Sequence, residues 1–127
     1  VNCKAKLDIT NPAFNADIKT CQDASPQEFV RNFMKLDYYR QAAIYNFAVF
    51  GKDYAKKPFY FIAVEKSAPY GCAVYKVTQE ALEYGFNEYE ELIERFDSCR
   101  RKDVWPGYEI LSLSGVIDLD IPNYMKV

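Results

Sequence analysis

Two carboxylates and a lysine near the start of the chain have the residue types and spacing of a site for a divalent cation. Asp17 and Lys19 flank Ile18 in a run typical of a β-strand. Because side chains alternate along a strand, Asp17 and Lys19 share one face, about 7 Å apart, and we expect Ile18 to point into the core. The turn signal Asn11-Pro12 predicts an antiparallel hairpin that places Asp8 directly opposite Asp17.

Facing carboxylates repel each other, so such a pair needs a reason, and a divalent cation supplies one. Hard oxygen ligands favour Mg²⁺ or Mn²⁺ over zinc. The ammonium of Lys19, beside that cation, could orient or deprotonate a water for attack on a phosphodiester and stabilise the negative charge that develops. A D-x-K run on a strand is also often a solvated face with a salt bridge, and this motif alone leaves that interpretation open.

The elements that must position this site begin with two short strands, residues 3–9 and 14–20. The run Ser25-Pro26-Gln27-Glu28 is typical of a capping box at the start of a helix. Helical spacing predicts that this helix buries four apolar side chains, Phe29, Val30, Phe33 and Leu36. Asp37 can cap a second helix over residues 38–50, which Gly51 ends.

The second half of the chain adds a hairpin of strands over residues 59–65 and 71–78 and an amphipathic helix over residues 79–101. Its polar face is expected to point five glutamates into water, Glu83, Glu88, Glu90, Glu91 and Glu94. An alternating segment follows at residues 110–119. The order β-β-α-α-β-β-α predicts an α/β fold in which helices flank a mixed β-sheet.

Composition excludes several classes of site. The 127 residues, half of them hydrophobic, suffice for one domain, so we expect a single domain over residues 1–127. The absence of histidine excludes Ser/His/Asp and Cys/His catalysis and His-ligated zinc or haem in this chain. The net charge of -2 does not by itself indicate nucleic acid or a membrane as a partner.

The four cysteines form no C-x-x-C pair, which argues against zinc ribbons and iron–sulfur clusters. Nothing resembles a signal peptide or a membrane span. We therefore expect a cytoplasmic protein with reduced, mostly buried thiols, and a secreted protein with a disulfide pair is the alternative.

One further pattern links the second helix to the carboxylates. Gln41 and Tyr45 stand four residues apart, which places them on one helical face. A helix packed through its alanines, with Gln41 at the rim, would give the same pattern.

Together these runs resemble the PD-(D/E)XK nuclease superfamily, in its RecB-like branch, and more closely the RecE-type and phage-type exonucleases. The resemblance rests on five runs, which are Lys4-Ala5-Lys6-Leu7-Asp8, Asp17-Ile18-Lys19-Thr20, the Q-x-x-x-Y of residues 41–45, and later similarities at residues 64–70 and 105–108. It implies a restriction-endonuclease-like core. It also implies that Asp8, Asp17 and the backbone carbonyl of Ile18 ligate Mg²⁺ (or Mn²⁺), and that Lys19 serves the attacking water.

The resemblance gives the remaining residues their roles. Gln41 and Tyr45 would position the lysine or the DNA strand, and Lys4, Lys6 and Thr20 would contact substrate. The branch usually draws another metal ligand from a helix upstream of the first aspartate, so we expect the domain to lack an upstream N-terminal segment.

The implied function is a Mg²⁺-dependent exonuclease acting on double-stranded DNA ends in recombination or repair. Its expected partners are further copies of itself in a ring and a single-strand annealing protein, without a membrane. The alternative is a non-catalytic nuclease-like domain that binds DNA or a protein partner.

Three other groups have simpler interpretations. Asp118 and Asp120 could form a second metal site, but charges on an exposed strand edge explain them more simply. Glu65 could assist the metal site, although a salt bridge to Lys66 is favoured. The basic run at residues 100–102 could touch phosphate, and cations also suit a helix C-terminus.

Overall fold

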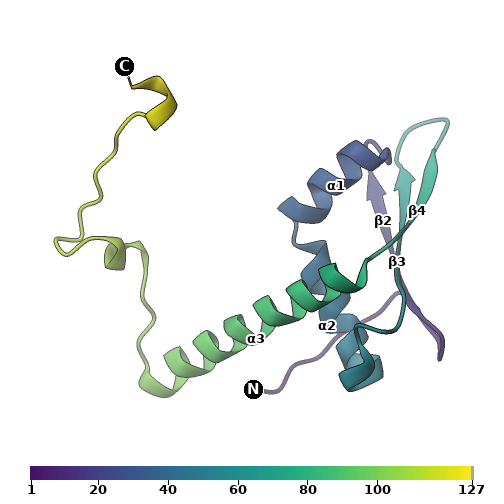
Figure 1. Ribbon diagram of the computed structural model, residues 1–127, viewed down its shortest axis with the longest axis horizontal. Coiled ribbons are helices and arrows are strands. Elements are labelled where there is room, and N and C mark those ends of the chain that lie inside the picture. Colours follow the sequence, from purple (N-terminus) through teal and green to yellow (C-terminus); the bar gives the residue numbers. More distant parts are fainter. Residues whose placement is uncertain (127) are drawn as a thin grey trace. The chain divides into compact units, whose positions relative to one another are not determined.

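A four-stranded mixed sheet with the strand order β1-β2-β3-β4 organises the computed structural model, which describes residues 1–126 (Figure 1). The strands are β1 (Ile9–Thr10), β2 (Asn15–Cys21), β3 (Phe59–Glu65) and β4 (Cys72–Lys76). β2 runs parallel to β3, and the other neighbouring pairs are antiparallel. The predicted α/β class with a mixed sheet and flanking helices is confirmed, and it is consistent with a restriction-endonuclease-like core.

Helices connect and follow these strands. α1 (Pro26–Lys35) and α2 (Tyr38–Phe50) lead from β2 to β3, and α3 (Gln79–Lys102) follows β4. Short 3₁₀ turns occur at Gly51–Asp53, Tyr108–Leu111 and Asn123–Met125. The chain divides into two compact units, Val1–Glu94 and Arg95–Val127, and the first contains the whole sheet. In the described residues no helix is long and apolar enough to cross a membrane.

The core of the first unit lies where α1 and α2 cover one face of the sheet. Phe59 and Phe61 of β3 are fully buried there. Phe29 of α1 stacks on Tyr75 of β4, with ring centroids 4.6 Å apart, and Tyr38 of α2 lies 5.5 Å from Phe61. Such aromatic pairs bury large apolar areas, so the two helices are held to the sheet mainly by rings.

On the opposite face of the sheet, a row of apolar side chains that crosses the middle of β2, β3 and β4 is largely exposed to solvent. The register aligns Ile18 with Ile62 and Ile62 with Val74. Ile18 is 49% exposed and Val74 is 64% exposed. The prediction that Ile18 points into the core is wrong, because α1 and α2 cover the face that carries its neighbours Asp17 and Lys19.

Local details of the two crossover helices differ from their sequence signals. Ser25 stands at the N-cap of α1 in an extended conformation, but its side chain makes no capping hydrogen bond within the described residues. Its backbone N–H donates instead to Asp23 Oδ1 at 2.8 Å. Phe29 is buried as predicted, whereas Val30 and Leu36 are more than half exposed, because the sheet contacts only a narrow stripe of this helix. α2 has the predicted bounds, and Gly51 follows it with φ 58°.

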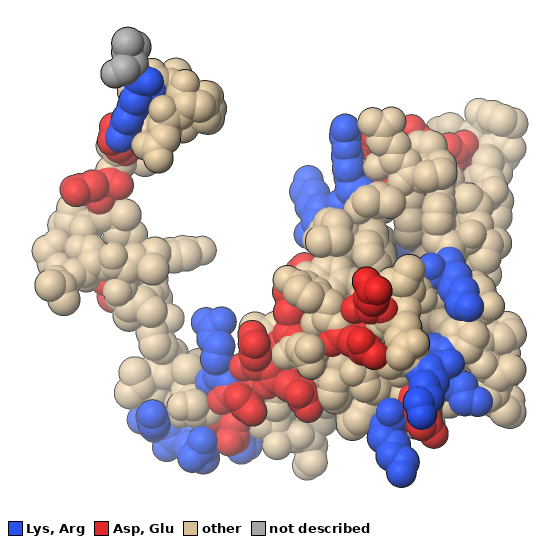
Figure 2. Space-filling model, in the orientation of Figure 1, with Lys and Arg blue, Asp and Glu red and all other residues tan. Residues whose placement is uncertain are grey.

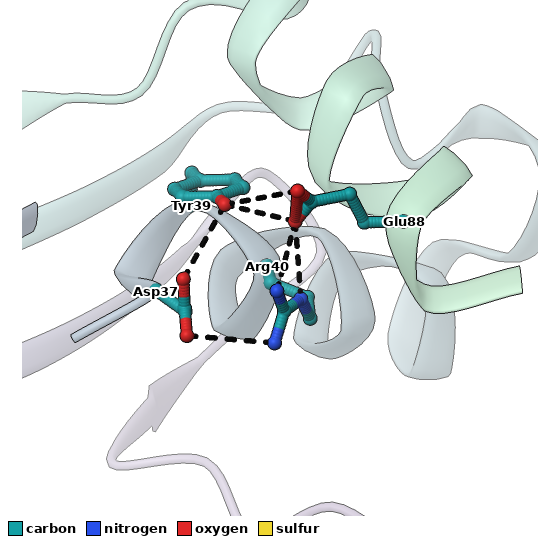
Figure 3. A network of polar contacts seen from close by, with 4 residues as sticks. All are labelled: Asp37, Tyr39, Arg40 and Glu88. Atoms are coloured by element: carbon teal, nitrogen blue, oxygen red, sulfur yellow. Dashed lines mark hydrogen bonds and ion pairs between the residues drawn. The ribbon is translucent and has the colours of Figure 1, made fainter. Parts of the chain in front are cut away.

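α3 is attached to α2 by a close backbone contact and by an ion pair. A Cβ at Gly85 would lie 2.6 Å from the backbone oxygen of Tyr39, so only glycine fits there without movement. Glu88 accepts hydrogen bonds from Arg40 Nη2 at 2.9 Å and Tyr39 Oη at 2.8 Å (Figure 3). The prediction that Glu88 faces water is therefore wrong. The other acidic side chains of the helix do gather on its surface (Figure 2).

Two further predictions are corrected, one at the start of the chain and one at its thiols. The strand expected over residues 3–9 is reduced to β1, since residues 1–7 make no ladder and Asp8 lies in a bend. The alternating segment 110–119 begins in a 3₁₀ turn and continues as turns and irregular backbone. Cys3, Cys21, Cys72 and Cys99 are free, but Cys21 alone among them is buried, so mostly buried thiols were wrongly expected.

Candidate active site on β2

The β1–β2 hairpin brings the two predicted metal carboxylates together. Its register pairs Ile9 with Ala16 and Thr10 with Asn15, and one step further along places Asp8 opposite Asp17. Asp8 lies just outside β1, and its Oδ2 accepts the backbone N–H of Ile18 at 3.0 Å. The predicted juxtaposition of the two carboxylates is present in the structure.

The two carboxyl groups have opposite electrostatic environments. Burial raises the pKa of Asp17, the hydrogen bond from Lys19 opposes this, and the neighbouring Asp8 raises it further. The hydrogen bond from the Ile18 N–H lowers the pKa of Asp8, helped by its contact with Asp17. Paired carboxyl groups with pKa values driven apart are typical of functional sites, although ion-pair networks also produce them.

Lys19 completes a triad of charges in which Asp17 is buried, Lys19 is mostly buried and Asp8 is exposed. Its Nζ lies 2.8 Å from Asp17 Oδ2, and its side chain is 19% exposed, against 6% for that of Asp17. The same Nζ stands over the ring of Tyr38, 4.5 Å from the centroid. This is not the solvated surface salt bridge that the D-x-K run alone allowed.

The two α2 residues predicted for the site lie on one helical face. Gln41 Nε2 donates to the Tyr45 hydroxyl at 3.2 Å. Gln41 Oε1 is buried and has no hydrogen-bond partner within the described residues. A buried acceptor without a partner is costly, so this oxygen is available to a donor such as a bound water. The positioning roles of Gln41 and Tyr45 stay predictions.

The predicted substrate-binding residues are more dispersed. Lys4 and Lys6 are exposed in the irregular segment that leads to Asp8, and the charge of Lys6 contributes to the lowered pKa of Asp8. Thr20 is exposed, but strand alternation places it on the face opposite Lys19. The structure therefore places the charge of Lys6 where it acts on Asp8, brings no such contact from Lys4 within the described residues, and points Thr20 to the other side of the sheet.

The donor chemistry at β2 fits a hard divalent cation. Mg²⁺ is commonly bound through one or two carboxylates, with water and substrate oxygens filling the other positions. Asp8 and Asp17 supply two such groups, and the repulsion between them is the feature that a cation would relieve. Residues 1–126 contain no group of three or more His, Cys, Asp or Glu side chains placed to hold a metal. The pair thus resembles a Mg²⁺ or Mn²⁺ site rather than a structural zinc site.

Sequence reasoning missed a buried amide chain that fixes this hairpin. Asn15 Nδ2 donates to Asn46 Oδ1 at 2.9 Å, and both residues are fully buried. Asn15 Oδ1 accepts from the Thr10 hydroxyl at 2.6 Å. Asn46 Nδ2 donates to the backbone oxygens of Tyr54 and Lys57. The signal in the sequence was an asparagine on a strand and another inside an apolar helix, where each needs a partner.

The three remaining candidate groups have local partners. Glu65 accepts the backbone N–H of Ala24 at 3.0 Å, so it supports the loop that leads into α1. Asp120 pairs with Lys126 at 2.5 Å, and its neighbourhood is not a strand edge. The first two members of the basic run, Arg100 and Arg101, both pair with Asp97 inside the second unit.

Comparison with known families agrees with this geometry. Residues 1–115 match the family described as "PDDEXK-like domain of unknown function (DUF3799)". The chain belongs to this family of PDDEXK-like domains. Its superfamily, predicted from the carboxylates, the lysine and the Q-x-x-x-Y run, is therefore confirmed, and the fold is nuclease-like. No curated protein matches this PDDEXK-like domain.

Proposed function

We propose that this PDDEXK-like domain is a Mg²⁺-dependent DNA exonuclease of the RecE type, acting on the ends of linear double-stranded DNA in recombination or repair in the cytoplasm. The observation that carries the proposal is the triad on β2. Asp17 is 4% exposed, Lys19 Nζ lies 2.8 Å from it, and Asp8 faces it across the hairpin. Asp17 and Lys19 are largely withdrawn from water beside a second, exposed carboxylate, an arrangement that is costly for folding alone.

Each residue of the triad has a definite task in this proposal. Asp8 and Asp17 would hold Mg²⁺ or Mn²⁺, with the backbone carbonyl of Ile18 as a further oxygen ligand, and the cation would supply Lewis acidity at the scissile phosphate. Lys19 would orient the attacking water through Nζ and stabilise the charge that develops on the phosphate oxygens. Gln41, with its unpartnered Oε1, would hold water or a DNA strand beside Tyr45.

The surroundings agree with a polyanionic substrate that approaches from one side. Lys4 and Lys6 are exposed on the segment that leads to Asp8, and the charge of Lys6 acts on that carboxylate. The acidic surface gathers over α3 (Figure 2). Basic residues near the site attract phosphates, and acidic residues elsewhere explain the net charge of -2. In the proposed assembly a ring of identical chains encloses the duplex, and a single-strand annealing protein receives the product strand.

The test is degradation of end-labelled linear duplex DNA in Mg²⁺ and in EDTA. We expect wild-type chain to degrade it in Mg²⁺ only, and Asp17→Asn and Lys19→Ala each to lower the rate at least about 100-fold. The matched controls are Asp53→Asn and Lys35→Ala, which change exposed groups of the same types. Far-UV circular dichroism confirms that each variant is folded. Full activity in both site variants would refute the assignment.

A second candidate is a non-catalytic nuclease-like domain that binds DNA or a protein partner. The observation in its favour is that residues 1–126 provide two clustered carboxylates rather than three acidic or thiol ligands. Titration with Mn²⁺, followed by electron paramagnetic resonance, separates the two. Saturable binding that Asp17→Asn abolishes favours the nuclease, and duplex binding without any saturable Mn²⁺ site favours the inert domain.

A further inference from the structure

A tyrosine that the nuclease signature does not include forms one wall around the site lysine. Lys19 Nζ stands 4.5 Å from the ring centroid of Tyr38 and 5.9 Å from that of Phe61. A cation within about 6 Å of an aromatic face is attracted by the negative face of the ring. Tyr38 is the nearer ring, and Asp17 contacts the same ammonium at 2.8 Å.

The backbone that carries Tyr38 is held in place by its neighbours. Asp37 directly precedes it with φ 55°, in the left-handed region, and α2 begins at Tyr38 itself. The next two residues, Tyr39 and Arg40, both bind Glu88 of α3, and Arg40 also pairs with Asp37 at 3.5 Å (Figure 3). The first turn of α2 is therefore fixed on both sides of Tyr38.

The ring itself is fixed as well. Its centroid lies 6.1 Å from that of Phe29 and 5.5 Å from that of Phe61, so α1 and β3 both pack against it. A ring that is held by its own backbone and by two neighbouring rings presents a rigid face. The flexible side chain of Lys19, with four rotatable bonds, gains a fixed position by resting on that face.

The proposed function creates a conflict that this face resolves. If Asp8 and Asp17 held a divalent cation, Asp17 would be shared between that cation and Lys19, and the two positive charges would repel each other. An aromatic face attracts the ammonium without competing for a carboxylate oxygen. We propose that Tyr38 is a positioning residue whose ring holds the ammonium of Lys19 beside the reacting phosphate while Asp17 binds the metal. This inference rests on the nuclease function proposed above.

The first arm of the test varies the electrons of the ring at nearly constant size. Phenylalanine and its mono-, di- and trifluorinated analogues replace Tyr38 in the full chain, and Mg²⁺-dependent cleavage of linear duplex is measured. We expect Tyr38→Phe to stay within about twofold of wild type and activity to fall stepwise with each fluorine, to a total of about 3- to 30-fold. The same series at Phe33, which packs on Phe61 and Tyr39 without a cation, should leave activity unchanged.

A structural role alone would not give a dependence on fluorination at position 38 and none at position 33. Equal activity across the Tyr38 series, or an equal decline at both positions, would overturn the inference. Circular dichroism on each protein excludes loss of fold as the cause.

The second arm does not depend on nuclease activity. Lysine labelled with ¹³C gives a methylene signal next to Nζ, which is assigned by its loss in Lys19→Arg. We expect this signal to be shifted upfield by the ring of Tyr38, to remain upfield in Mg²⁺, and to move to an ordinary position in Tyr38→Leu. An ordinary position in wild type, or loss of the shift on adding Mg²⁺, would overturn the inference. If wild type does not cleave DNA but keeps the upfield signal, the nuclease proposal fails and the contact with Tyr38 stands.

Discussion

Replacement of Asn46 by alanine should be among the most damaging single changes in the first unit. The side chain is fully buried and makes three hydrogen bonds, one from Asn15 Nδ2 at 2.9 Å and two to the backbone oxygens of Tyr54 and Lys57 at 3.0 and 2.9 Å. Its removal leaves a buried donor and two acceptors without this partner. At about 1–3 kcal/mol for each such group, and with partial relaxation, we expect a loss of about 3–5 kcal/mol in the free energy of unfolding.

The assay is urea unfolding of the full chain, followed by far-UV circular dichroism, with Asn87→Ala as the matched control. Asn87 is exposed on α3, so its replacement should change stability by no more than about 0.5 kcal/mol. The double variant Asn15→Ala/Asn46→Ala should lose less than the sum of the two single losses, because each replacement removes a partner of the other. A loss below about 1 kcal/mol in Asn46→Ala, or strictly additive losses, would refute the reasoning.

Three further outcomes follow from the contacts of α3 and from the thiols. The hydrogen bond from Arg40 lowers the pKa of Glu88 below its ordinary value of 4.5. The ionised Glu88 therefore stabilises the fold above pH 4.5, and this stability is lost as the pH falls through the lowered pKa. Glu88→Gln should cost about 1–2 kcal/mol in urea unfolding at pH 7 and much less at pH 3. Gly85→Ala should cost about 1–3 kcal/mol in the same assay, because its Cβ would meet backbone of α2 at 2.6 Å. A thiol reagent should modify exposed Cys3 and Cys72 rapidly and Cys21 slowly, since burial raises the pKa of that thiol; equal rates would contradict the described exposures.

Local sequence signals predicted most elements of the first unit because those signals are strong there. β3 and α2 have the predicted bounds, and α3 differs by one residue at its end. These segments combine dense apolar residues with clear breakers such as Gly51. The alternating segment at residues 110–119 forms no strand within the described residues, because alternation alone cannot form a strand without a neighbouring strand to pair with.

Some features of the candidate site depend on nearby residues and could be predicted, whereas others depend on tertiary packing and could not. The pairing of Asp8 with Asp17 follows from a short hairpin, so turn position and strand period were enough to predict it. The direction of Ile18 depends on which face of the sheet α1 and α2 cover, and nothing within residues 15–21 determines that. Tyr38 escaped notice for the same reason, since its ring meets Lys19 only after the crossover from β2 to α2 is complete.

The face that the helices cover changes what the D-x-K run means. On an open face, Asp17 and Lys19 would form an exposed pair worth less than about 1 kcal/mol, with no need for Asp8. Under α2 the pair is desolvated, and a second carboxylate beside it raises the pKa of Asp17 further instead of relieving it. A chain selected only for stability would lose little, or gain, if well-packed apolar side chains replaced Asp17 and Lys19 together. The combination of a buried carboxylate, a mostly buried ammonium, an aromatic face and a second, exposed carboxylate is therefore better explained by chemistry at this site than by folding.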